Sequence, residues 1–129
     1  MKLEAKKSRI LIVEDEVKQL EALMNKFSRE DFVVLEAKNG KVGLEIALRE
    51  HPDLILLDVI MPVMDGMTML KKLREDKWGK HIPVIILTNL TSADDARNRD
   101  VTELEPACYL VKSDWKLEDV VKKVKERLS

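Results

Sequence analysis

The chain has 129 residues, enough for one ordinary domain with its own core, and its formal net charge is −1. Hydrophobic residues make up 45% and charged residues 36%, a balance typical of a folded soluble domain and unlike that of a disordered chain. The charge balance gives no basic surplus for direct nucleic acid binding, and the sequence has no membrane-spanning run or secretion signal. The single cysteine, Cys108, cannot form an internal disulfide, so we expect a cytoplasmic protein.

Five short aliphatic runs predict the strands of a buried parallel sheet. They are residues 9–15 (RILIVED), 33–37 (VVLEA), 53–59 (DLILLDV), 82–89 (IPVIILTN) and 107–112 (ACYLVK). Several of these runs are apolar at consecutive positions and do not alternate with polar residues. That pattern is typical of strands that are covered on both faces.

Helical periods separate the strands. The apolar positions that we expect to face the sheet are Val17, Leu20, Leu23, Met24 and Phe27; Val42, Ile46 and Leu48; Met67, Leu70 and Leu73; and Leu117, Val120, Val121, Val124 and Leu128. The second of these helices follows a predicted turn at Asn39-Gly40. One more helix, with few apolar residues, is predicted over 92–104. Strand and helix thus alternate five times, which predicts a parallel α/β sandwich.

Four of the predicted strands end in residues that can take part in chemistry: Glu14 and Asp15 after the first, Asp58 after the third, Thr88 after the fourth and Lys112 after the fifth. Ligands of open parallel sheets bind outside the carboxyl ends of the strands. If the first and third strands are neighbours, three carboxylates meet there, and their repulsion and desolvation require positive charge nearby. Oxygen ligands favour a hard cation such as Mg²⁺, and Lys112 would supply a second positive charge.

A carboxylate, a hard cation, a lysine and a hydroxyl together fit phosphoryl transfer. Asp58 would be the nucleophile, while the cation and Lys112 would neutralise the phosphoryl oxygens. Thr88 would bond an oxygen of the attached group and so sense the modification. The structural alternative is that Asp58 caps a turn and that Glu14 or Asp15 caps a helix. The joint arrival of three acids and a lysine favours the chemistry.

The segments ILIVEDE, LILLDVIMPVMDG, VIILTN and CYLVKSD, in this order and spacing, resemble the receiver domains of response regulators in two-component signalling. The resemblance implies one receiver domain over residues 1–129, with a core of about 8–128. It also implies a flavodoxin-like three-layer sandwich, with a five-stranded parallel sheet in the order 2-1-3-4-5 and five helices. Such a protein is a signalling switch and not an enzyme, although it promotes its own phosphorylation and dephosphorylation.

The resemblance further implies that Asp58 accepts a phosphoryl group from a histidine kinase or a histidine phosphotransfer protein. Mg²⁺, or Mn²⁺, would be held by Asp15, by Asp58, by Glu14 mainly through water, and by the backbone carbonyl of Ile60. The acceptor and the metal site would therefore share Asp58.

In the same family, Thr88 and Lys112 would bind the attached phosphoryl group, and the rotamer of Tyr109 would follow it. The surface of the fourth helix, fifth strand and fifth helix would then change, for an unidentified protein target or for a phosphorylation-dependent homodimer. Three parts of the chain depart from the common pattern. Ser113 replaces the proline that usually follows the lysine, EPAC at 105–108 replaces the usual Gly-Ala before the fifth strand, and Asn89 replaces a smaller residue.

Two other classes of function stay open at this point. A small Mg²⁺-dependent phosphatase would also form an aspartyl phosphate, but such enzymes carry an acid two residues after the nucleophile, where this chain has Ile60. A receiver-like scaffold that binds partners without phosphorylation would not need Asp15, Asp58, Thr88 and Lys112 together. Turnover of phosphomonoesters would favour the first class, and the absence of any Mg²⁺ response would favour the second.

Overall fold

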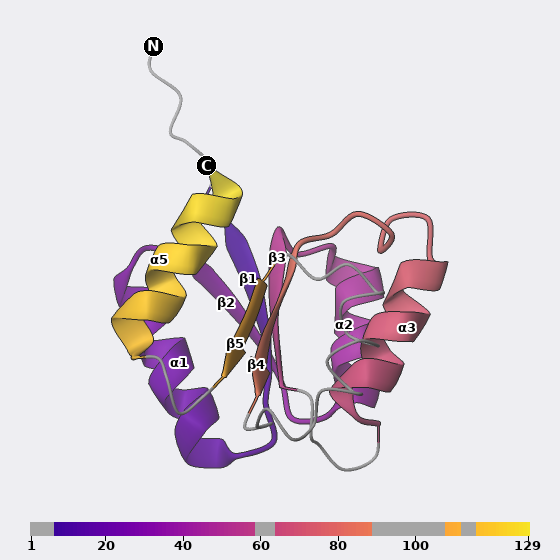
Figure 1. Ribbon diagram of the computed structural model, residues 1–129, viewed down its shortest axis with the longest axis horizontal. Helices are drawn as coiled ribbons and strands as arrows, with labels where there is room; N and C mark the ends of the chain where they lie inside the picture. The colour runs from indigo at the N-terminus through magenta and orange to yellow at the C-terminus, as the bar shows by residue number, and fades with distance from the viewer. Residues whose placement is uncertain (1–6, 59–63, 89–107, 112–115) are drawn as a thin grey trace.

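Figure 1 shows the computed structural model, which describes residues 7–58, 64–88, 108–111 and 116–129, with the backbone alone for Thr88 and for 108–111. Its elements are β1 (Arg9–Val13), α1 (Val17–Arg29), β2 (Val33–Ala37), α2 (Gly40–Glu50), β3 (Leu54–Asp58), α3 (Gly66–Glu75), β4 (Val84–Thr88), β5 (Cys108–Val111) and α5 (Leu117–Leu128). The helix predicted over 92–104 lies outside the described residues. None of the described helices is long and apolar enough to cross a membrane.

The strands form one parallel five-stranded sheet in the order β2-β1-β3-β4-β5, as the family resemblance implied. Helices α1 and α5 cover one face of this sheet, and α2 and α3 cover the other (Figure 1). The chain moves outward from β1 to β2 and then returns to the other side of β1 for β3. The point where strand order reverses therefore lies between β1 and β3, where open parallel sheets bind their ligands.

The central strand β3 explains why its sequence is aliphatic at consecutive positions. All five of its residues are buried, because both faces of the strand are covered by helices. Leu54 and Leu56 join the core under α1 and α5, and Ile55 and Leu57 join the core under α2 and α3. The strand is thus held from both sides up to its last residue, Asp58.

The apolar face predicted for α2 is confirmed for Ile46, which is half-buried against the core, and is wrong for Val42 and Leu48. Val42 and Leu48 are 38% and 37% exposed, and the buried residues of this helix include the smaller Gly43 and Ala47. A Cβ atom at Gly43 would lie 2.9 Å from a methyl carbon of Val13. Because the helix lies this close to β1, glycine is the residue that faces Val13, while Leu44 and Ile46 pack against the core only partly buried.

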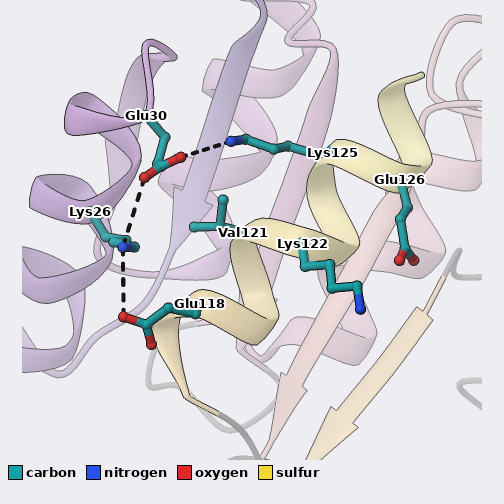
Figure 2. Close-up of a pocket in the computed structure, with 7 residues that line it drawn as sticks. All are labelled: Lys26, Glu30, Glu118, Val121, Lys122, Lys125 and Glu126. Carbon is teal, nitrogen blue, oxygen red and sulfur yellow. Dashed lines mark hydrogen bonds and ion pairs between the residues drawn. The ribbon is translucent and has the colours of Figure 1, made fainter.

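Helix α5 packs against α1 through its predicted apolar face, which includes the buried Val121, and through exposed ion pairs. Lys125 Nζ lies 2.7 Å from Glu30, and Lys26 Nζ lies 3.8 Å from Glu30 and 3.7 Å from Glu118. Figure 2 shows these side chains along a groove of about 410 Å³ between the two helices. Opposite charges therefore connect α1 and α5 on the flank of the molecule.

The turn after α3 lies at the opposite end of the sheet, where the strands begin. The Asp76 carboxylate accepts hydrogen bonds from the backbone N–H groups of Trp78, at 2.9 Å, and Gly79, at 3.0 Å. Arg74 donates to the Gly79 carbonyl at 2.8 Å. The Trp78 ring stacks on His51, which ends α2 in a left-handed conformation, with ring centroids 4.3 Å apart. These contacts organise the amino-terminal end of the sheet.

Candidate metal centre

Three carboxylates come together at the carboxyl ends of β1 and β3. Glu14 and Asp15 follow the last residue of β1 directly, and Asp58 is the last residue of β3. The two strands are adjacent and their last paired residues are Val13 and Leu57, so both acidic segments continue from the same level of the sheet. One oxygen atom from each carboxylate lies within 4.8 Å of the others. The structure therefore brings the three acids together, as the strand order requires.

The environment of the cluster is asymmetric. Glu14 is 1% exposed and Asp58 is 5% exposed, whereas Asp15 is open to solvent. Burying carboxylates costs free energy unless hydrogen bonds or positive charge stabilise them. A Glu14 oxygen accepts a hydrogen bond from the backbone N–H of Glu16 at 3.2 Å. Helix α1 begins after Glu16 and has no side-chain cap, so the cluster acids do not serve as the conventional N-cap.

The donor set of the cluster fits a hard divalent cation. All three side chains offer carboxylate oxygens, and neither histidine nor cysteine belongs to the group. Mg²⁺ typically binds one or a few carboxylates and keeps several water molecules, for which the exposed side of Asp15 leaves room. In the part of the chain that the structure describes, no second group of three such side chains could hold a metal ion.

The remaining predicted residues are described less completely. Thr88 is the last residue of β4, which pairs with β3, so its backbone lies at the same end of the sheet as Asp58. Thr88 pairs with the last residue of β5, and Lys112 follows that residue in the sequence. Tyr109 lies on β5, two positions before the partner of Thr88. The side chains of Thr88 and Tyr109 are not described, and Ile60 and Lys112 lie outside the described residues.

The sequence predicts a turn at Asn39-Gly40, but the structure shows that these two residues form the start of α2, close to the site. Asn39 is the N-cap of α2, since its side chain accepts a hydrogen bond from the Val42 N–H at 2.9 Å. Gly40 is the first residue of the helix, and its N–H donates to the Met64 carbonyl at 3.0 Å. The signal in the sequence is Asn39, because asparagine is a preferred N-cap residue.

The fold and the site together define a class of protein: a flavodoxin-like parallel α/β protein with an acidic cluster at the point where strand order reverses. Within that class, residues 10–125 match the response regulator receiver domain family. This match covers most of the chain. The protein therefore belongs to that family, whose members are signalling domains of two-component systems.

Relatives of known identity agree with this assignment. The chain is 45% identical to histidine kinase P4 of Formosa agariphila over 89 residues, which are 69% of this chain and 6% of that protein. It is 35% identical to protein PilH of Pseudomonas aeruginosa over 88 residues, 68% of this chain and 73% of that protein. The match to the kinase thus involves only a small part of its length.

A solved structure with the same fold is the complex of CheX with CheY, BeF₃ and Mg²⁺ from Borrelia burgdorferi. The TM-score is 0.83 and the sequence identity is 25%, over 95% of this chain and 90% of that chain. The arrangement of strands and helices is therefore that of known receiver proteins.

Proposed function

We propose that this protein is a phosphorylation-dependent signalling switch and that Asp58 is the residue that accepts the phosphoryl group. The observation that carries the proposal is the position of Asp58. It ends the central strand, which is buried on both faces, and its carboxylate lies within 4.8 Å of those of Glu14 and Asp15. A nucleophile held this rigidly is pre-organised for attack on a group that enters from the open side of the cluster.

The proposed metal ligands are Glu14, Asp15, Asp58 and the backbone carbonyl of Ile60, and the ion would be Mg²⁺ or Mn²⁺. When bound, this ion would neutralise part of the charge on the phosphoryl oxygens. The all-oxygen donor set supports the assignment. So does the likeness to the Borrelia complex, which contains Mg²⁺ and BeF₃.

The proposed donor is a phosphohistidine, presented by a histidine kinase or a histidine phosphotransfer protein. An oxygen of Asp58 attacks the phosphorus atom, a phosphorus–oxygen bond forms, and the bond from phosphorus to the imidazole nitrogen breaks. The electron pair of the broken bond leaves with the imidazole nitrogen. Lys112 and Thr88 bind oxygens of the transferred group, which reduces their negative charge and holds them in place.

The signal then passes from Thr88 to Tyr109 and to the surface of β5 and α5, together with the helix predicted over 92–104. A changed surface can bind a downstream protein target or a second copy of the chain. Thr88 and Tyr109 lie on adjacent strands, β4 and β5, whose backbones are paired, and this proximity supports a direct route between them.

Intact-mass measurement after incubation with a small phosphodonor and Mg²⁺ tests the proposal. The wild type should gain one phosphoryl group, and Asp58→Asn should gain none. Asp53→Asn is a matched control, because Asp53 directly precedes the same strand at its other end, where it accepts a hydrogen bond from the Arg9 N–H at 2.7 Å. Phosphorylation of Asp58→Asn at the wild-type level would refute the assignment of the acceptor.

A further inference from the structure

We propose that Gly40 is a positioning residue of the metal site, because its missing side chain lets the first turn of α2 contact Met64, six positions after Asp58 in the sequence. This inference rests on the proposed metal site. It concerns a residue that neither binds the ion nor contacts the phosphoryl group.

The close approach is between Gly40 and Met64. The Gly40 N–H donates a hydrogen bond to the Met64 carbonyl oxygen at 3.0 Å. A Cβ atom at Gly40 would lie 2.2 Å from that same oxygen, closer than real Cβ atoms come to any backbone atom. None of the described glycines has a positive φ angle, so this position requires space and not an unusual conformation. Any side chain at residue 40 must therefore displace Met64 or the start of α2.

The same part of the chain also contacts the other acidic segment. The Ala37 carbonyl, just before α2, accepts a hydrogen bond from the Glu14 N–H at 3.0 Å. One turn into the helix, Gly43 packs against the side chain of Val13, the last residue of β1. The residues around the start of α2 thus contact both Glu14 and Met64, which follows Asp58 by six positions in the sequence.

A connection of this kind should set the relative positions of the metal ligands. Groups that hold the ligands of a metal ion, without touching the ion, typically change its affinity by about tenfold to a hundredfold when they are altered. Gly40 contacts Met64, while Ala37 and Gly43, three positions before and after it, contact Glu14 and Val13. Its replacement should therefore weaken Mg²⁺ binding by a factor in this range.

Gly40→Ala and Gly79→Ala form a matched pair for the test. A Cβ atom at Gly79 would lie 2.2 Å from the Leu73 carbonyl oxygen, the same separation as at Gly40, but at the opposite end of the sheet. Mg²⁺ affinity is measured for each full-length variant by calorimetric titration with the metal alone, and thermal unfolding without metal reports the loss of stability. We expect Gly40→Ala to lose about tenfold or more in affinity and Gly79→Ala to stay within about twofold of the wild type. Equal affinities in both variants would overturn the inference.

If Gly40→Ala does not fold, Asn39→Ala tests the same contact without a clash. It removes the bond between the Asn39 side chain and the Val42 N–H and so loosens the turn that carries Gly40. Its control is Asp119→Ala, which removes the 2.8 Å bond from the Lys116 N–H at the start of α5. A loss of Mg²⁺ affinity in Asn39→Ala alone supports the inference, and an unchanged affinity overturns it. Absence of Mg²⁺ binding by the wild type would overturn the proposed metal site itself, and the role of Gly40 with it.

Discussion

The acidic cluster and the groove between α1 and α5 use charge in opposite ways. At the carboxyl end of the sheet, three carboxylates lie within 4.8 Å of one another and two of them are buried. Along the groove, three lysines and three glutamates alternate on the surface (Figure 2). Like charges held together in a buried place lower the stability of the fold, whereas exposed pairs of opposite charge change it little. The difference identifies the cluster as the place where a cation can increase stability.

The largest expected effect is stabilisation by Mg²⁺. A ligand that binds the folded state alone adds about 2.7 kcal/mol to the free energy of unfolding at a hundred times its dissociation constant. Denaturant unfolding of the wild type with and without Mg²⁺ measures this gain. Asp15→Asn should lose most of it, because it removes the exposed carboxylate of the cluster. An equal gain in wild type and variant would place the bound metal elsewhere.

A smaller effect of opposite sign is expected without metal. Asp58→Asn removes one of the like charges at almost unchanged shape, so we expect the metal-free variant to be more stable than the wild type by about 1 kcal/mol. The same substitution should abolish the gain from Mg²⁺. Urea unfolding in the presence of a chelator measures the first effect. A metal-free variant less stable than the wild type would show that repulsion in the cluster is already offset within the protein.

The smallest effect concerns the groove. The hydrogen bond and positive charge of Lys125 lower the pKa of Glu30 from its ordinary value of 4.5, with a smaller contribution from Lys26. Because the folded-state pKa is lowered, the stabilisation is present above the unfolded value and is lost as the pH falls through the folded value. Glu30→Gln should therefore be slightly less stable than the wild type at neutral pH, and the difference should vanish in acid.

Salt should also reduce the effect of Glu30→Gln, since the Debye length is only about 10 Å at 0.1 M ionic strength. Lys122→Gln is the control: within the described part of the chain this groove residue makes no ion pair, and its loss should not change stability. A Glu30→Gln difference that persists in acid and high salt would contradict an electrostatic origin.

Much of the fold could be predicted from the sequence, because its strongest signals are local. The run Leu54–Leu57 is aliphatic on both faces, and that pattern requires cover from both sides whatever the covering helices are. The alternation of strand and helix makes the strands parallel, so Glu14, Asp15 and Asp58 had to reach the same end of the sheet once β1 and β3 were neighbours. The strand order itself came from the family resemblance.

Other features depend on contacts between distant segments, and only the tertiary structure decided them. Helical spacing predicts that Val42, Ile46 and Leu48 face the sheet, but only Ile46 packs against the core. Where α2 comes closest to β1, Gly43 faces Val13. The contact of Gly40 with Met64 spans 24 positions along the chain and depends on how close two backbones come. The sequence by itself thus determined the type of fold and which acidic residues meet at the carboxyl ends of the strands. Packing decided which residues of α2 are buried and which glycine contacts Met64, because close approach is a property of the folded chain and leaves no periodic pattern in the sequence.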